Sequence, residues 1–214
     1  MSFVPELSVL AAFTLAAFIL TVTPGPDMTF YMSKALTQGR KAGMVAIVGA
    51  TNGVMIHAFL AAVGVSALLA ASEFAFQILK TVGALYLAYL AVQILRNGSA
   101  FSLEHGDAPR ETSGSIWAKA VTINLLNPKV VLFFVTFLPQ FVSATDPYAA
   151  SKLLFLGVFF IVLNVPSNLA LMLGASAVST FLRSSPRVMR LMDYSFAAIM
   201  AAFAVKLLSA RSTA

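Results

Sequence analysis

The sequence contains no cysteine and very little charge. Its 214 residues include 14 Lys and Arg, 8 Asp and Glu, and 2 His. Without cysteine the chain has no disulfide, no thiol redox chemistry and no cysteine-based metal site, and two histidines are too few for an all-histidine zinc site. We therefore expect neither a metal nor a cofactor. A charged fraction of 10% also excludes an ordinary soluble domain.

Hydrophobic residues, in contrast, make up 59% of the chain. Six bilayer-spanning helices of about 20 residues would use about 120 residues, which nearly matches the hydrophobic content. Long apolar runs lie at residues 7–36, 43–71, 74–95, 116–142, 153–182 and 187–209. The alternation typical of membrane barrels is absent from these runs. The sequence thus predicts an all-α polytopic membrane protein with six transmembrane helices in a single domain, residues 1–214.

The longest polar segment, residues 97–115, divides the chain into two halves of three predicted spans, residues 1–96 and 116–214. Nine basic residues lie on the side of the membrane that holds this loop, and four lie on the other side. Because Lys and Arg concentrate in cytoplasmic loops, we expect the loop to be cytoplasmic and both termini to lie outside. This scattered distribution accounts for the net charge of +6 and argues against nucleic acid as a partner.

Proline interrupts two of the apolar runs in the same way. The first run reads TPGPD at residues 23–27, and the fourth reads NLLNPK at residues 124–129. Both runs exceed the length of one straight crossing, so each predicts a broken helix, whose freed backbone must line a cavity or be buried in protein. Aligning Pro26 with Pro128 relates the halves and predicts an inverted 3+3 repeat with Pro-broken helices 1 and 4, a pattern typical of transporters.

Asp27 and Lys129 directly follow these prolines. Asn127 is a favoured N-cap and Pro128 a favoured first helical residue, so the fourth span is predicted to restart there. Lys129 then lies at the positive end of a helix, where a cation needs an anionic partner. The two charges would complement a zwitterionic amino acid. Two alternatives stay open: an internal Asp27–Lys129 ion pair, and Asp27 as the proton carrier of an antiporter.

The second span carries Gly49, Gly53, His57 and Gly64 on one stripe. The glycine pair predicts close approach of another helix. His57 is a candidate for a proton relay, for a ligand contact, or simply for a hydrogen bond to a neighbouring helix. Asn52 lies off the stripe and is a candidate for the cavity or for packing against another span.

The fifth span carries Asn164, Pro166 and Asn168, which predict a kink with two amides on one face and a third wall of the cavity. The candidate proton-coupling residues are Asp27 and His57. The predicted substrate-binding residues are Asp27, Lys129, Asn127, Pro128, Gly25, Asn52, His57, Asn124, Asn164 and Asn168.

These motifs resemble the LysE/RhtB family of bacterial amino-acid exporters. The resemblance rests on TPGP in the first helix, GRKAG before the second, GATNGVMIH within it, GALYLAYL in the third and NLLNPK in the fourth. It implies an exporter of amino acids or their derivatives in the bacterial inner membrane, driven by the proton gradient. The matching positions are Thr23, Pro24, Gly25, Pro26, Asp27, Gly49, Gly53, His57, Asn127, Pro128 and Lys129. Val54 departs from the acidic or polar residue that many similar members carry there.

We accordingly expect a transporter rather than an enzyme. One alternative is an intramembrane enzyme that uses Asp27 and His57 as acid and base. Another is a membrane assembly subunit that depends on its Gly49–Gly53 face. Besides the amino acid and the lipid bilayer, the expected partner is a second copy of the chain, in a homodimer formed through a glycine-rich face.

Overall fold

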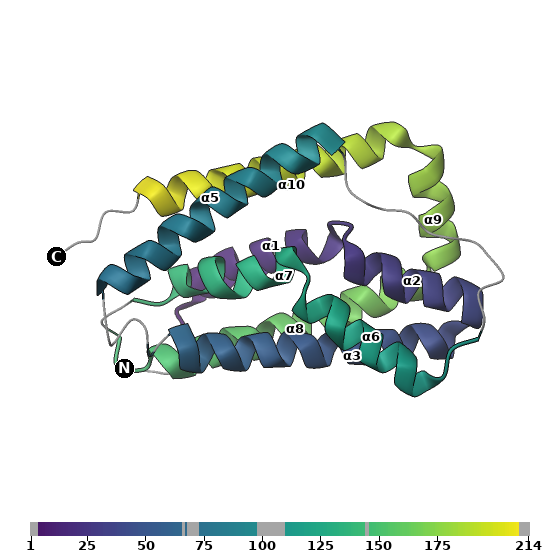
Figure 1. Cartoon of the computed structure of the whole chain (residues 1–214), viewed down its shortest axis with the longest axis horizontal. Helices are drawn as coiled ribbons and strands as arrows, with labels where there is room; N and C mark the ends of the chain where they lie inside the picture. The colour runs from purple at the N-terminus through teal and green to yellow at the C-terminus, as the bar shows by residue number, and fades with distance from the viewer. Residues whose placement is uncertain (1–3, 66, 68–72, 98–109, 144–145, 210–214) are drawn as a thin grey trace.

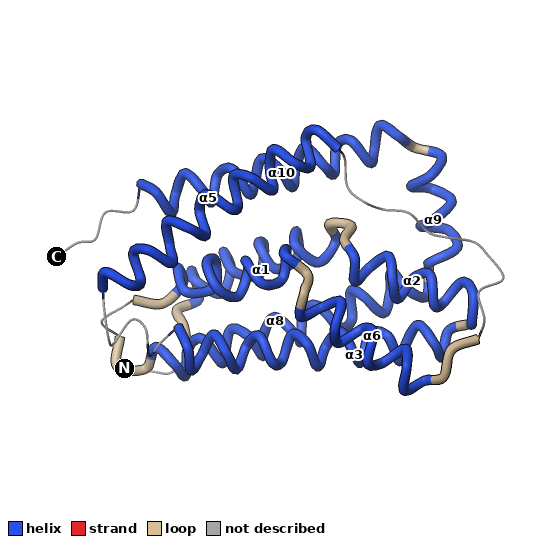
Figure 2. The backbone as a smooth tube through the Cα atoms, viewed as in Figure 1, coloured by secondary structure: helices blue, strands red, loops and turns tan. Residues whose placement is uncertain are grey.

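The computed structural model describes residues 4–65, 67, 73–97, 110–143 and 146–209, and every regular element in these ranges is helical. Figure 2 shows these helices together with the short loops that the structure describes between them. The long helices run back and forth between two ends of the molecule, with α1 and α2 in one direction and α6 and α7 in one direction. As a result, α1 begins and α10 ends at the same end (Figure 1). The predicted all-α class is confirmed.

Two helices are long and apolar enough to cross a membrane by themselves. One is α3, Arg40–Leu60, which continues into the π-helical turn η1, Ala61–Val65, with the apolar stretch covering Arg40–Gly64. The other is α8, Ala149–Leu173, which continues through Pro166. The apolar run predicted as the fifth span therefore divides after Leu173.

Both predicted broken helices are bent. Helix α1, Leu7–Val22, meets α2, Pro26–Gln38, at 52°. Helix α6, Ser113–Leu125, meets the segment Pro128–Phe141 at 50°. That segment comprises α7, Pro128–Leu132, the π-helical η2, Phe133–Phe137, and the 3-10 helix η3, Leu138–Phe141. If each bent pair is one span, the described residues contain four candidate spans.

The remaining helices are α5, Glu73–Asn97, α9, Ala175–Ser184, and α10, Pro186–Ser209. Helices α5 and α10 pack side by side as a separate layer, and α9 connects α8 to α10 (Figure 1). Within the described residues, neither α5 nor α10 combines enough length, apolar character and freedom from charge to count as a candidate membrane span. Six spans and the inverted repeat therefore stay predictions.

Two clusters of buried apolar side chains lie toward opposite ends of the molecule, with the helix breaks between them. The first includes Phe13, Phe133, Phe134, Phe137 and Phe160, and the second includes Met28, Tyr31, Met32, Ile116 and Met172. The rings of Phe133 and Phe160 are 4.9 Å apart. In a bilayer such contacts stabilise the fold by van der Waals packing, because lipid tails are as apolar as the side chains. The polar residues at the breaks are therefore enclosed from both sides.

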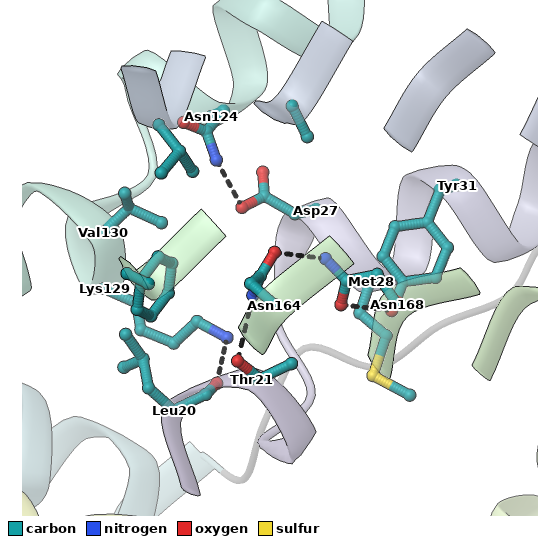
Figure 3. Close-up of a pocket in the computed structure, with 13 residues that line it drawn as sticks. Leu20, Thr21, Asp27, Met28, Tyr31, Asn124, Lys129, Val130, Asn164 and Asn168 are labelled. Carbon is teal, nitrogen blue, oxygen red and sulfur yellow. Dashed lines mark hydrogen bonds between the residues drawn. The ribbon is translucent and has the colours of Figure 1, made fainter. Parts of the chain in front are cut away.

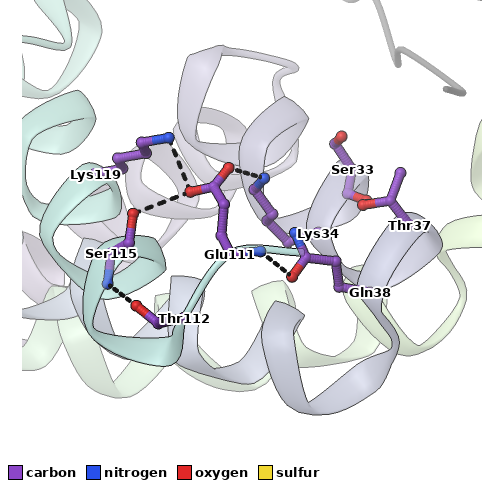
Figure 4. Close-up of polar contacts among 8 residues, drawn as sticks. All are labelled: Ser33, Lys34, Thr37, Gln38, Glu111, Thr112, Ser115 and Lys119. Carbon is purple, nitrogen blue, oxygen red and sulfur yellow. Dashed lines mark hydrogen bonds and ion pairs between the residues drawn. The ribbon is translucent and has the colours of Figure 1, made fainter. Parts of the chain in front are cut away.

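A cluster of charged side chains joins α2 to the start of α6 (Figure 4). Glu111 accepts from Lys34 Nζ at 2.6 Å and from Lys119 Nζ at 2.8 Å, and its backbone N–H donates to Gln38 Oε1 at 3.0 Å. Hydrogen bonds from Lys119 and Lys34 lower the pKa of the Glu111 carboxyl from 4.5 to about 2. One carboxylate thus ties the two broken spans together outside the apolar region.

Replacing Glu111 by glutamine is expected to lower the midpoint of thermal unfolding at neutral pH by about 2–4 °C. Because the folded-state pKa is depressed, the ionised carboxylate stabilises the fold fully above pH 4.5, and this contribution is lost as the pH falls toward 2. The difference between wild type and variant should therefore narrow in that range. Thermal scans of detergent-purified protein across pH measure it. The exposed Glu6 provides the control Glu6→Gln, and a pH-independent difference would contradict the assignment.

Candidate functional site

The first break is an unwound stretch between α1 and α2. Helix α1 ends at Val22, where Thr23 Oγ1 donates to the Ile19 carbonyl at 2.6 Å. Gly25 is the extended N-cap of α2, and Pro26 is its first residue. Asp27 therefore lies in the first turn of α2, where the helix dipole favours a carboxylate.

The second break follows the pattern predicted from the sequence. Asn127 caps α7, since its Oδ1 accepts from the Lys129 backbone N–H at 3.1 Å, and Pro128 is the first helical residue. The predicted restart of the fourth span at Asn127 and Pro128 is confirmed. Lys129 is thereby placed one turn from the end of α6, in the corresponding position to Asp27.

The carboxylate of the first break is bound by the amides of the second. Asp27 Oδ2 accepts from Asn124 Nδ2 at 2.9 Å and from Asn127 Nδ2 at 3.0 Å. The other oxygen, Asp27 Oδ1, is buried and has no hydrogen-bond partner among the described residues, and the same holds for Asn124 Oδ1. Two buried acceptors are thus left unsatisfied, an arrangement that favours a ligand with N–H donors.

The cation of the second break is bound by the first. Lys129 Nζ donates to the carbonyl of Leu20 at 3.0 Å and to that of Thr23 at 2.9 Å. These carbonyls belong to the end of α1, where the helix dipole is negative. Among the described residues, the ion pairs formed by lysine involve Glu111 and Asp146 and not Asp27. Asp27 and Lys129 therefore brace each other's helix breaks without a direct ion pair.

Asp27 and Lys129 line one small cavity between the two breaks (Figure 3). Its volume is about 30 Å³. The polar lining comprises Thr21, Asp27, Tyr31, Asn124, Lys129, Asn164 and Asn168, and the apolar lining comprises Leu20, Met28, Ala50, Val54, Val130 and Phe160. A cavity of this size holds about two water molecules, so a larger ligand requires the walls to separate.

The amides of α8 form the third wall, as a chain of hydrogen bonds. Tyr31 Oη donates to Asn168 Oδ1 at 3.2 Å, and Asn168 Nδ2 donates to Asn164 Oδ1 at 2.6 Å. Asn164 Nδ2 then donates to Thr21 Oγ1 at 2.9 Å (Figure 3). Sequence reasoning found the two asparagines but missed Tyr31, which is 1% exposed. Its position four residues after Asp27, on the same helix face, was the available signal.

The glycine stripe of α3 packs against α6. A Cβ added to Gly49 would come within 2.6 Å of the Trp117 carbonyl oxygen, and one added to Gly53 within 2.5 Å of Asn124 Oδ1. The predicted close approach of another helix to this glycine pair is therefore confirmed. A Cβ added to Gly64 would meet no atom of the described residues within 4 Å, so Gly64 takes no part in the contact.

Five of the predicted substrate-binding residues lie apart from the cavity lining: Gly25, Asn127 and Pro128 at the helix breaks, and Asn52 and His57 on α3. His57 is buried, its Nε2 lies 3.4 Å from the Asn124 carbonyl oxygen, and its ring stacks on Phe134. This geometry matches the simplest of the three roles considered for it, a contact with a neighbouring helix. Asn52 is exposed on α3 and does not line the cavity.

Comparison with known proteins gives a consistent result over nearly the whole chain. The LysE type translocator family matches residues 18–211. The homoserine/homoserine lactone efflux protein of Salmonella typhimurium is 30% identical over 200 residues, 94% of this chain and 96% of that protein. The leucine efflux protein of Salmonella choleraesuis is 28% identical over 203 residues, 94% of each chain. An uncharacterized membrane protein of Vibrio cholerae is 28% identical over 207 residues, 97% of this chain and 100% of that protein.

No solved structure matches the chain. The family match extends over nearly all of the sequence, including both helix breaks and every helix from α2 to α10. The chain belongs to the LysE type translocator family.

Proposed function

We propose that this protein is a secondary exporter of neutral amino acids and their amine-bearing derivatives across the bacterial inner membrane. The names of its relatives support efflux of homoserine, homoserine lactone and leucine by those proteins. These three compounds share a primary amine that is protonated at neutral pH. The lactone has no free carboxylate, so the amine is the charged group common to all of them.

The observation that carries this proposal is the buried Asp27 Oδ1 in the wall of the cavity, which has no hydrogen-bond partner within the described part of the chain. A carboxylate oxygen in such a position is the natural acceptor for an ammonium group. Asn124 Oδ1 is also without a partner among the described residues, but it faces α3, where a Cβ at Gly53 would lie 2.5 Å from it. An ammonium that reached the cavity would satisfy Asp27 Oδ1 and neutralise the charge of Asp27.

Lys129 supplies the complementary donor. An ammonium has three N–H donors, and the two carbonyls at the end of α1 use two of them. The third donor is available to a substrate carboxylate or to a lactone carbonyl. Leu20, Met28, Val54 and Phe160 would surround an uncharged side chain. A second acidic group for a dibasic substrate is absent from the described lining.

Transport would proceed by alternating access around this site. The two bent spans, with their half-helix ends at the cavity, have the form expected for gating elements of a secondary transporter. We place the loop at residues 97–115 in the cytoplasm and both termini in the periplasm, on the distribution of basic residues. The two halves would form an inverted repeat around the cavity.

We further propose that export is coupled to proton entry. A proton and a substrate ammonium would compete for the same carboxylate, Asp27, and this competition is the simplest basis for an antiport cycle. His57 is a second candidate for the proton pathway, since it is buried next to the Asn124 carbonyl.

Counterflow in proteoliposomes tests the proposal. Vesicles loaded with unlabelled leucine, homoserine, threonine or lysine are placed in labelled substrate at two pH gradients. We expect the vesicles to accumulate a labelled neutral amino acid by counterflow. We also expect net efflux of that amino acid into substrate-free buffer to be faster when the outside is acidic. Accumulation of lysine alone would contradict the proposed substrate class, and net efflux that ignores the gradient would contradict proton coupling. A protein that accumulates none of them would contradict the exporter assignment for this panel.

A further inference from the structure

The amides of Asn164 and Asn168 keep hydrogen-bonding groups that the rest of the described chain does not use. The two side chains lie one turn apart on α8, and both line the cavity. A primary amide has two N–H donors and two acceptor positions. Asn168 donates one N–H to Asn164, which donates one N–H to Thr21, and each amide oxygen accepts one hydrogen bond. Within the described residues, each amide therefore keeps one N–H and one acceptor position without a partner.

Both ends of this hydrogen-bond chain are fixed by buried side chains. Thr21 is 6% exposed, and its hydroxyl donates to the Ala17 carbonyl at 2.8 Å, so it can only accept from Asn164. At the other end, the buried hydroxyl of Tyr31 donates to Asn168. Turning either amide over would break a hydrogen bond on each side of it. The unused N–H groups are therefore held in place before a substrate enters.

The proposed binding mode leaves this wall of the cavity for the substrate side chain. In that mode Asp27 binds the ammonium and Lys129 binds the carboxylate, and both residues come from the helix breaks and not from α8. The third substituent of the α-carbon then meets the remaining lining, which combines apolar residues such as Met28 and Phe160 with the α8 amides (Figure 3). A short side chain with methylene groups and a polar tip matches this combination.

We propose that the α8 amides form a side-chain subsite, and that this exporter prefers amino acids with a side-chain hydroxyl over aliphatic amino acids of the same shape. A hydroxyl donates one hydrogen bond and also accepts, so it can satisfy an unused N–H and an unused acceptor position of the amides together. A methyl group in the same place would displace water from the amides and leave both unpaired, which is unfavourable. This inference rests on the proposed exporter function and narrows its substrate class.

Isosteric pairs of amino acids separate this subsite from an ordinary apolar pocket. Homoserine and norvaline differ only by a hydroxyl in place of a methyl group, and so do threonine and valine. An apolar pocket would favour norvaline and valine, because a hydroxyl buried there loses its hydrogen bonds to water. The amide subsite should instead favour at least one hydroxylated member over its partner by about tenfold or more. The direction of the preference therefore identifies the kind of pocket.

The experiment is a competition in proteoliposomes. Counterflow of the labelled neutral amino acid that wild type accumulates best is inhibited with each of the four unlabelled amino acids, and the half-inhibiting concentrations give a ratio for each pair. Asn164→Leu and Asn168→Leu remove one amide each with little change in volume, and both should reduce the preference for the hydroxyl to near or below equality. Tyr31→Phe removes only the first donor of the chain and should reduce it by a smaller factor. Asn52→Leu provides the control, because it makes the same change on α3, away from the cavity lining.

The ratio also distinguishes the subsite from a structural brace, because a brace would change the rate for both members of a pair alike. A hydroxyl preference in wild type that falls in the three cavity variants and persists in Asn52→Leu supports the inference. Equal inhibition within both pairs in wild type, or stronger inhibition by norvaline and valine, would overturn it and leave the exporter assignment standing. A preference that persists in the folded asparagine variants would also overturn it, and if these do not fold, an unchanged ratio in Tyr31→Phe would do so. A wild-type protein without counterflow of any amino acid would overturn the proposed function, and this inference with it.

Discussion

Replacing Asp27 by asparagine is expected to abolish efflux while the protein still inserts and folds. The change removes the only carboxylate that lines the cavity in the described residues. Asparagine keeps the shape of the side chain and one acceptor for Asn124 and Asn127, so the two breaks should stay joined. Removing one partner of a buried charged interaction costs about 2–5 kcal/mol, which corresponds to a loss of about 30-fold or more.

Initial rates of labelled-substrate exit from proteoliposomes measure this loss, with size-exclusion chromatography to verify folding. Asp146→Asn is the matched control. Asp146 is outside the spans and pairs with Lys152, and a hydrogen bond from Lys152 lowers the pKa of its carboxyl. Its replacement should leave exit rates nearly unchanged. Efflux by a folded Asp27→Asn protein at the wild-type rate would remove Asp27 from the site.

Replacing Gly53 by alanine is expected to reduce both stability and efflux. The new Cβ would lie 2.5 Å from Asn124 Oδ1 and 2.8 Å from Asn124 Cβ. Asn124 is 1% exposed and donates to Asp27, so it has little room to move without losing that hydrogen bond. Overpacking of this kind costs about 1–3 kcal/mol, and a protein of this size loses about 2–4 °C in unfolding midpoint per kcal/mol.

Thermal unfolding in detergent and exit rates in proteoliposomes measure the two effects. Gly64→Ala is the control within the same span, because no atom of the described residues lies within 4 Å of a Cβ at Gly64. The control should leave both measurements close to wild type. If Gly53→Ala behaved like Gly64→Ala, the contact between α3 and α6 would not support Asp27 in the way described.

The helix breaks were predictable because their causes are local. Proline lacks a backbone N–H and fixes its own φ angle, so Pro26 and Pro128 must start helices or interrupt them. Asn127 has a side chain that caps the N–H of Lys129, a contact between residues two positions apart. The close approach at Gly53 was also readable, since only the absence of a side chain admits another helix there.

The partners of the two charges were not predictable. From sequence, Asp27 and Lys129 could bind substrate or each other, and a charge alone does not identify what it contacts. The structure places Lys129 on the carbonyls of Leu20 and Thr23, which no sequence pattern marks because every residue has a carbonyl. Asn52 was a candidate by residue type alone, and the rotation of α3 leaves it exposed.

By itself, the sequence determined an all-α membrane protein, the positions of both breaks and the set of polar residues that the bilayer would otherwise disfavour. These properties depend on composition and on residues within one helical turn of each other. Only the tertiary structure decided that Asp27 binds the amides of the second break, that Lys129 binds the carbonyls of the first, and that Tyr31 joins the α8 amides. Those contacts join residues about 100 or more positions apart, and helix packing alone sets which of them meet.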